Sequence, residues 1–352
     1  MALLRGYNIE KIKWIISTID CSVASASSGF VFVNSSGIHL KNLDFESCGE
    51  TIPLYGDKHM HSAAALSFQH GSNIQLHSIT VKNTRGFGLH TSNVFGSISI
   101  SESAFLQSKG KKTGIAIGNA RFWFGVECGE QCSSSGVTHV NITSSQFLDG
   151  QGNVNGLEVI IGCPSVYVVI ENSTIRNNRG ENGGNLALSV TDLGMPLNET
   201  IIKVSNSHIE EGRAKKGGGL RFWSRTDQKD ASICTDTNIH RILEVYNTTF
   251  RSNFASRTGG ALYMIHYQSG GFDCIVKKIT FTLCKFEHNF GNGAAMEITK
   301  HLILADHASP LLNVSFENCT FFKKFNFRSY CKWSSHEFYH DLHQNGKLHH
   351  NW

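Results

Sequence analysis

The sequence predicts an all-β protein, a parallel β-solenoid of about ten coils in which three short sheets run the length of the stack. One apolar pattern recurs ten times along the 352 residues. Within it, apolar side chains are spaced by two, as in strands, and no 3.6-residue helical period accompanies them. With 34 Gly, only 4 Pro and 40% hydrophobic residues, the composition excludes a disordered or collagen-like chain.

Each repeat is centred on one large apolar residue, its anchor. The anchors are Ile19, Phe45, Val81, Phe105, Phe147, Ile175, Ile209, Phe250, Phe286 and Phe321. Seven and five residues before every anchor stands another apolar residue, such as Ile38 and Leu40 before Phe45. This spacing places two side chains on one face of a first strand. The anchor and a small residue two positions before it, such as Ser145, predict a second strand after a bend.

A third apolar pair follows most anchors by ten to twelve residues, usually behind Gly, as Leu262 and Met264 do. Coils would stack at about 4.8 Å, so residues with equal offsets from their anchors should be neighbours. Asn178, Asn253 and Asn289, three after their anchors, are then expected to be turn residues that bond the backbone of the adjacent coil. A further asparagine row stands three before the anchors, at the bend, and consists of Asn172, Asn206, Asn247 and Asn318.

The cysteines follow the same rows. Pairs on adjacent coils are Cys21 with Cys48, Cys132 with Cys163, Cys234 with Cys274, and Cys284 with Cys319. One coil step suits the Cα separation of a disulfide, so all four pairs are disulfide candidates. For Cys284 and Cys319, a stack of buried thiols is an equal alternative. A zinc site at Cys128, Cys132 and Cys163 would need a fourth ligand, and no metal or cofactor is expected.

Cysteines and glycosylation sequons together favour an extracellular or cell-surface location. The sequon asparagines are Asn34, Asn141, Asn172, Asn198, Asn247, Asn313 and Asn318. The first twenty residues lack the features of a signal peptide, which indicates a fragment of a longer chain or, alternatively, a cytoplasmic protein. No apolar stretch is long enough for a membrane span, and a net charge of +4 is too weak for a nucleic-acid surface.

The segment FRSNFASRTGGALY (250–263), with drifted copies at 286–298 and 175–188, resembles a known group of proteins. It is similar to the right-handed parallel β-helix or pectin-lyase-like fold, and in particular to repeats of chlamydial polymorphic outer membrane proteins and to β-helix domains of large extracellular proteins of simple animals. The resemblance covers residues 8–326 and implies a right-handed solenoid. Residues 327–352 are expected to form a polar, His-rich tail outside the repeats.

The resemblance raises the possibility of a polysaccharide-cleaving enzyme, whose carboxylates would lie on the outer face. The expected outward row of the third strands is Val31, Ser67, Ala116, Glu158, Ala187, Arg221, Tyr263 and Glu297. Glu158 and Glu297 are then four coils apart, about 19 Å, too far to cooperate in glycoside cleavage. Asp44, Glu158, Glu244 and Glu297 are expected to be isolated.

Other outward charges are also explained without a substrate. Arg176, Glu210, Arg251 and Glu287 alternate in sign along consecutive coils and predict a surface salt-bridge ladder. Asp20 and Glu46 form an adjacent acidic pair near one end. No catalytic residue is therefore assigned.

Insertions at 118–137, 223–241, 265–277 and 299–311 share the corner after the third strand. Near this corner, Arg221, Trp223, Arg225 and Tyr263 form a candidate recognition edge, because aromatic and charged groups together suit a glycan or protein surface. The predicted function is a non-enzymatic extracellular scaffold or recognition β-helix, whose partners are a carbohydrate or a cell-surface protein. The alternative is a polysaccharide lyase or glycoside hydrolase of the same fold.

Overall fold

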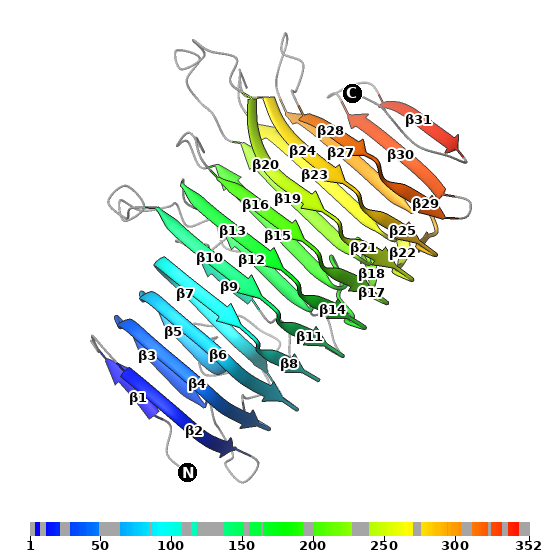
Figure 1. The fold of residues 1–352 in the computed structure, drawn as a ribbon. Coiled ribbons are helices and arrows are strands. Elements are labelled where there is room, and N and C mark those ends of the chain that lie inside the picture. Colours follow the sequence, from blue (N-terminus) through cyan, green and yellow to red (C-terminus); the bar gives the residue numbers. More distant parts are fainter. Residues whose placement is uncertain are drawn as a thin grey trace, which may run out of the picture.

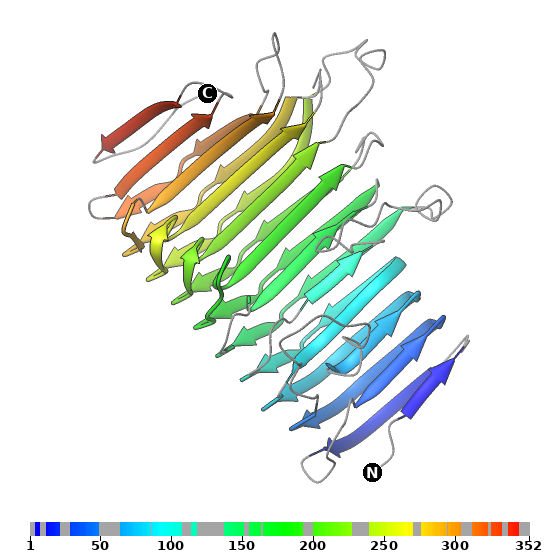
Figure 2. The same cartoon turned by 180° about the vertical axis from the view of Figure 1, so that it is seen from behind.

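The protein is all-β in the residues that its computed structural model describes. These are residues 4–7, 12–21, 29–48, 64–84, 86–107, 114–117, 137–150, 155–162, 165–192, 200–226, 239–269, 276–293, 295–303, 312–322, 325–332 and 337–344. No helix occurs among them. The strands stack along one axis, with β1 and β2 at one end and β30 and β31 at the other (Figure 1); the view from behind shows the same order from blue to red (Figure 2).

Each repeat contributes first, second and third strands, and three repeats add a further short strand. First and second strands are continuous in β2 (Ile12–Asp20), β4 (Ser36–Glu46) and β6 (Ser72–Lys82). β7 (Phe87–Ser101) joins a third strand to the next first strand. The other first strands are β10 (Thr138–Thr143), β13 (Val166–Glu171), β16 (Ile201–Ser205), β20 (Ile239–Tyr246), β24 (Val276–Thr282) and β28 (Leu312–Glu317).

The remaining strands follow the same order. Second strands are β8 (Ala104–Leu106), β11 (Gln146–Leu148), β14 (Thr174–Arg176), β17 (His208–Glu210), β21 (Thr249–Arg251), β25 (Lys285–Glu287) and β29 (Thr320–Phe322). The short strands are β18 (Arg213–Lys216), β22 (Phe254–Thr258) and β26 (Phe290–Gly291). Third strands are β1 (Leu4–Tyr7), β3 (Phe30–Val33), β5 (Ala64–Gln69), β9 (Gly114–Ile117), β12 (Leu157–Ile161), β15 (Leu186–Asp192), β19 (Leu220–Thr226), β23 (Leu262–Ser269), β27 (Met296–Ile303) and β30 (Phe325–Lys332), followed by β31 (Glu337–Gln344).

Equivalent strands of successive repeats pair in parallel, and the predicted register is confirmed. Every anchor lies opposite the next, from Ile19 with Phe45 to Phe286 with Phe321. The first-strand pairs are also aligned, as when Ile170 lies between Ile142 and Val204. Because side chains in a strand alternate between its faces, this alignment gathers the apolar residues into one continuous core.

In the repeats from Phe45 to Phe286, two left-handed residues enclose the second strand and make the bends that the odd spacing requires. They stand three before and two after the anchor. Around Ile175, Asn172 has a φ of 50° and Asn177 a φ of 54°. Around Phe105, the same positions hold Glu102 and Gln107, with φ of 50° and 52°. Asn is enriched at such positions because its side chain tolerates this conformation, which explains the asparagine row at the bend.

The small residues two before the anchors form a hydrogen-bonded ladder through the core. The Ser145 N–H donates to Ser173 Oγ at 3.2 Å, and the Ser173 N–H donates to Ser207 Oγ at 3.2 Å. Each hydroxyl also donates to the carbonyl two residues before it, as Ser173 Oγ does to Glu171 at 2.8 Å. The ladder therefore satisfies backbone groups that the bend removes from the strand pairing, without admitting water to the core.

Aromatic side chains stack along the same axis. Phe250 lies parallel to Phe286, with ring centroids 4.9 Å apart, and Phe286 lies parallel to Phe321 at 5.0 Å. Phe281 and Phe316 on the first strands stack in the same way at 4.9 Å. Offset stacking of this kind adds to the hydrophobic free energy of burial, so aromatic residues at equal offsets reinforce the register.

A second ladder, of asparagines, follows the second strands. Asn178 Nδ2 donates to the Phe147 carbonyl at 3.0 Å, and Asn253 Nδ2 donates to the Ile209 carbonyl at 2.8 Å. These are turn asparagines that bond the backbone of the preceding repeat. The repeat between them has Gly212 at the equivalent position and cannot supply the side chain.

Asn185 fills that gap from another turn. It is fully buried, its Nδ2 donates to the Glu210 carbonyl at 2.7 Å and to Asn253 Oδ1 at 3.1 Å, and its Oδ1 accepts from Asn178 Nδ2 at 2.9 Å. A Cβ at Gly212 would lie 2.6 Å from Asn185 Nδ2, so the glycine makes room for the amide. Equivalent turns carry Gly219 and Ala261, which is why no periodic signal identifies Asn185.

The structure differs from the sequence-based expectation in the third strands. Gly114, and not Ala116, lies opposite Glu158, because β9 aligns Ile115 with Val159. His90 occupies the rung between Ser67 and Gly114. Pairing also extends outside residues 8–326: β1 pairs with β3, and β30 continues the parallel stack with Phe327 opposite Met296. β31 then pairs with β30 in the antiparallel direction.

We expect Asn185→Ala to lower the free energy of unfolding by about 2–4 kcal/mol, because it removes the buried hydrogen bonds that Asn185 makes with the Glu210 carbonyl and with the side-chain amides of Asn178 and Asn253. Urea unfolding followed by circular dichroism measures the change. Asn292→Ala is the control, since Asn292 is exposed and donates only to the Ser256 carbonyl. Equal, small effects of the two substitutions would contradict the role of Asn185.

Candidate recognition site

The outward row of the third strands is the first candidate site. From Glu158 it continues through Ala187, Arg221 and Tyr263 to Glu297, one residue per rung. Glu158 and Tyr263 are only 5% and 3% exposed, although they point away from the core. The four rungs between the two glutamates correspond to about 19 Å. The pair therefore cannot act together on one glycosidic bond.

The polar groups of this row are engaged with neighbouring side chains. Lys216 Nζ donates to Tyr263 Oη at 3.0 Å and lies 4.9 Å from the centre of its ring. Thr258 Oγ1 donates to Glu297 Oε2 at 2.6 Å. Burial, reinforced by the charge of Glu297, raises the pKa of Tyr263 to about 12. Tyr263 therefore keeps its proton at neutral pH and cannot act there as a general base.

The predicted recognition edge is brought together only in part. Arg221 lies beside Tyr263, and burial lowers the pKa of Arg221 while the charge of Glu158 acts in the opposite direction. Trp223 is half-buried, and its ring centroid lies 5.9 Å from that of Tyr267. The Arg225 side chain and much of the corner loops lie outside the described residues. Trp223 and Tyr267 thus provide the accessible aromatic surface of this edge.

Most outward charges elsewhere have partners. Arg251 binds Glu210 at 2.8 Å, as the alternating row predicts. The expectation of isolated carboxylates is wrong for Glu244, which lies 3.3 Å from Lys203, and for Glu297. These carboxylates have partners because a side chain on the adjacent repeat can reach them across one strand spacing of about 4.8 Å. At the opposite end, Glu46 of the acidic pair lies 3.1 Å from Lys82.

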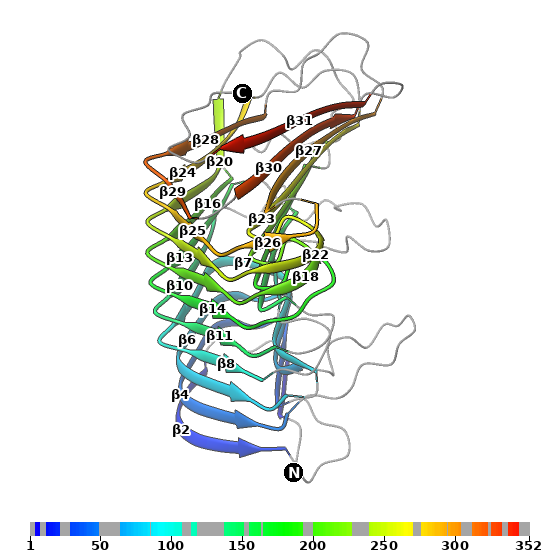
Figure 3. The same ribbon diagram turned by 90° about the vertical axis from the view of Figure 1, so that its right-hand side faces the viewer.

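A second candidate site lies over the short strands β18, β22 and β26, which Figure 3 shows stacked between the second and third strands. An open groove of about 520 Å³ is lined by Gly180, Glu181, Arg213, Ala214, Lys215, Ser252, Phe254 and Ser256. We call it the short-strand groove. Ala214 contributes apolar surface to the lining, and Phe254 contributes an aromatic ring. Its walls carry cations and aromatic rings.

One outward row crosses the groove and continues past it on both sides, over four repeats; Arg213 and Phe254 line the groove, and Arg179 and Phe290 flank it. Arg179 lies opposite Arg213, Arg213 opposite Phe254, and Phe254 opposite Phe290. Phe254 and Phe290 are 38% and 54% exposed, and their rings stack with centroids 5.6 Å apart. The surface thus presents two arginines and two phenylalanines in line. Sequence reasoning missed it because the short strands bury few residues and only small ones, although the patterns RAK and FAS alternate as a strand should.

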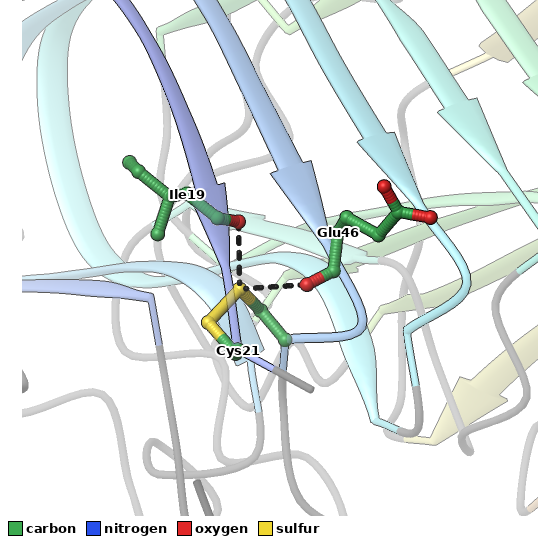
Figure 4. The surroundings of a disulfide bond; sticks show 4 residues. Ile19, Cys21 and Glu46 are labelled. Atoms are coloured by element: carbon green, nitrogen blue, oxygen red, sulfur yellow. Dashed lines mark hydrogen bonds between the residues drawn. A yellow bond between two sulfur atoms is a disulfide. The ribbon is translucent and has the colours of Figure 1, made fainter. Parts of the chain in front are cut away.

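The disulfide candidates have different outcomes. Cys21 and Cys48 are joined, with a Cα separation of 4.8 Å, and Figure 4 shows the bond beside the carbonyl groups of Ile19 and Glu46. Cys132, Cys163, Cys234 and Cys274 lie outside the described residues. Of the two alternatives for Cys284 and Cys319, the structure has the stack of buried thiols and no disulfide, because both cysteines are free and buried.

The two thiols instead continue the serine ladder. Cys319 Sγ donates to the Phe281 carbonyl at 3.3 Å, and Cys284 Sγ donates to the Thr282 carbonyl at 3.5 Å. A thiol can occupy a hydroxyl position in this ladder because it also donates and accepts. The hydrogen bond with Cys319 and burial raise the pKa of the Cys284 thiol.

Several sequon asparagines are exposed on the outer surface. They are Asn34, Asn141, Asn172, Asn247 and Asn318. Asn198 and the side chain of Asn313 lie outside the described residues. Asn172, Asn247 and Asn318 stand in the left-handed bend row, so turn geometry explains these asparagines whether or not they carry a glycan.

Among the described residues, no group of three or more His, Cys, Asp or Glu side chains could hold a metal ion. No helix in this part of the chain is long and apolar enough to cross a membrane. Comparison with protein-family models, curated proteins and solved structures found no match.

We expect Cys284 and Cys319 to resist alkylation by iodoacetamide in the folded protein at pH 8 and to react fully in urea, because burial shields both thiols from the reagent. The raised pKa of Cys284 also keeps that thiol protonated. Mass spectrometry of the alkylated peptides reads each cysteine separately. Cys284→Ser is the conservative variant and should fold, since Ser occupies the same ladder position in Ser173 and Ser207. Rapid alkylation of Cys284 or Cys319 in the folded protein would contradict their burial in the ladder.

Proposed function

We propose that the chain is a right-handed parallel β-helix that serves as a non-enzymatic extracellular scaffold and recognises a glycan or a protein on its outer surface. The parallel pairing of equivalent strands over successive repeats supports the β-helix. The GG turns support the likeness to pectin-lyase-like repeats. Gly217 and Gly259 have φ of 67° and 71°, and a Cβ at Gly259 would lie 2.7 Å from that of Tyr263.

The short-strand groove is the observation that most favours recognition. It is open, spans several repeats, and exposes large apolar rings beside cations, whereas most large apolar side chains of the repeats are buried. Exposed apolar groups gathered with charged groups at one place are typical of binding surfaces. Trp223 and Tyr267 offer a second, smaller aromatic surface.

The engagement of the outward carboxylates favours a non-catalytic role. Glycoside hydrolysis needs an acid and a second carboxylate about 5–9.5 Å apart, and lyase chemistry needs a base at the substrate. Glu158 and Glu297 are four rungs apart, and Glu297 accepts hydrogen bonds from Thr258 and Thr299. Tyr263, with its pKa raised to about 12, is a poor base.

The Cys21–Cys48 disulfide and the exposed sequon asparagines support an extracellular or cell-surface location. Disulfides persist in oxidising compartments and are rare where thiols are kept reduced. A cytoplasmic protein is the competing proposal, and it would keep Cys21 and Cys48 reduced in the cell.

The proposal predicts no turnover of polygalacturonate, alginate or chondroitin, with or without added Ca²⁺. Reducing ends and the ultraviolet absorbance of unsaturated uronate products measure hydrolase and lyase activity separately. Cleavage that is lost in Glu158→Gln or Glu46→Gln would overturn the proposal in favour of a polysaccharide-cleaving enzyme.

A further inference from the structure

The short-strand groove carries an excess of positive charge that the fold itself does not use. The segments that line or flank it, 179–181, 211–216, 252–258 and 288–293, contain Arg179, Arg213, Lys215, Lys216 and Arg257 but only Glu181 and Glu211 as carboxylates. Lys215 is paired with Glu181 at 2.7 Å, and Lys216 donates to Tyr263. Arg179 and Arg213 are exposed and have no carboxylate partner within the described residues.

Arginines on adjacent rungs repel each other, so a purely structural role would favour alternating signs at Arg179 and Arg213. The neighbouring second-strand row shows that alternation, with Arg251 bound to Glu210 at 2.8 Å. The groove row places like charges side by side instead. An anion that bridges the two guanidinium groups would remove this repulsion and form charge-assisted hydrogen bonds.

The same row continues into apolar surface. Phe254 and Phe290 follow Arg213 on the next two rungs and are exposed. A ligand that fits must therefore extend along the axis for about 14 Å, the length of three strand spacings, and offer both anionic and apolar faces. Acidic sugars have this combination, because each ring carries a carboxylate or sulfate on its rim and C–H groups on its face.

We propose that the short-strand groove binds an acidic oligosaccharide, with Arg179 and Arg213 on its anionic groups and Phe254 and Phe290 against its rings. This inference rests on the proposed recognition function and names its site and ligand class. A peptide strand fits less well, because β18 and β22 already pair on both sides, so strand addition could occur only at the outer edge of β26, away from Arg179 and Arg213. Two phenylalanines are also too small an apolar surface for a membrane.

Isothermal titration calorimetry of the full chain tests this with three probes: a heparin-derived octasaccharide carrying sulfates, an oligogalacturonate carrying carboxylates only, and neutral cellohexaose. The chain is expected to bind at least one acidic probe, more weakly as salt is raised, and not to bind cellohexaose. Comparing the first two probes shows whether sulfate or carboxylate is the preferred anion.

Two double variants locate the site. Arg179→Ser with Arg213→Ser is expected to weaken binding by about tenfold or more, since it removes the charge-assisted hydrogen bonds. Phe254→Thr with Phe290→Thr should weaken it by about threefold or more and leave the salt dependence in place. The matched control is Lys203→Ser with Lys285→Ser, which removes the same charge from exposed positions on β16 and β25 and should change affinity less than about twofold.

Three outcomes would overturn the inference. Binding of cellohexaose with the same affinity as the acidic probes would show that the negative charge of the ligand does not contribute to recognition. If the wild-type chain binds acidic sugar and the arginine variant binds it with unchanged affinity, the binding site lies elsewhere. The proposed recognition function would then still stand. Absence of glycan binding together with self-association that is lost in the phenylalanine variant would make the groove an interface between copies of this chain.

Discussion

In-register stacking of one repeat on the next is the constraint on which the rest of the structure depends. Parallel hydrogen bonding between equivalent strands fixes the rung spacing, so a side chain at any offset meets the side chain at the same offset one repeat later. A displacement by one residue would turn every apolar side chain outward. Ile142, Ile170 and Val204 can therefore remain buried only if the bends keep the chain in phase, although the lengths of the intervening segments differ.

The two ladders maintain that phase where strand pairing is interrupted. Serine and cysteine side chains satisfy backbone groups on one side of the second strand, and asparagine side chains do so on the other. Asn185 shows how strongly the chain depends on a complete ladder, because a side chain from another turn replaces the one missing at Gly212. Buried polar groups are expensive unless paired, so the ladders specify the bends as well as stabilising them.

Sequence periodicity predicts the first and second strands well because their inward residues are large and their offsets never change. The ten anchors and the residues five and seven before them keep the predicted register. The third strand is reached through turns of varying length, which is why Ala116 was expected where Gly114 lies. The residues that the short strands bury, Ala214, Ala255 and Thr258, are all small, and they give too little signal to identify a strand. Burial of Tyr263 on the outer face depends on tertiary neighbours, which a single sequence does not show.

In-register stacking also gives the groove a property that suits the proposed recognition. A stacked repeat presents side chains in straight rows, and a row of unlike groups, two arginines followed by two phenylalanines, is a surface of fixed spacing that does not contribute to the core. Substitution in this outer row changes the free energy of unfolding little, whereas substitution in the inward rows lowers it strongly. Function can therefore vary over the outer rows while the fold is held by the inner ones.

Disulfide trapping on the outer face tests the stacking register most directly. Lys203 lies opposite Glu244 on the next repeat, and both are accessible. Lys203→Cys with Glu244→Cys should cross-link readily under mild oxidation, because one strand spacing suits a disulfide. Lys203→Cys with Tyr246→Cys should cross-link poorly, since a shift of two residues separates the Cα atoms by about 8 Å. Mass spectrometry identifies each bond. Equal yields, or a preference for the Tyr246 pair, would contradict the register and with it the stacked-repeat account.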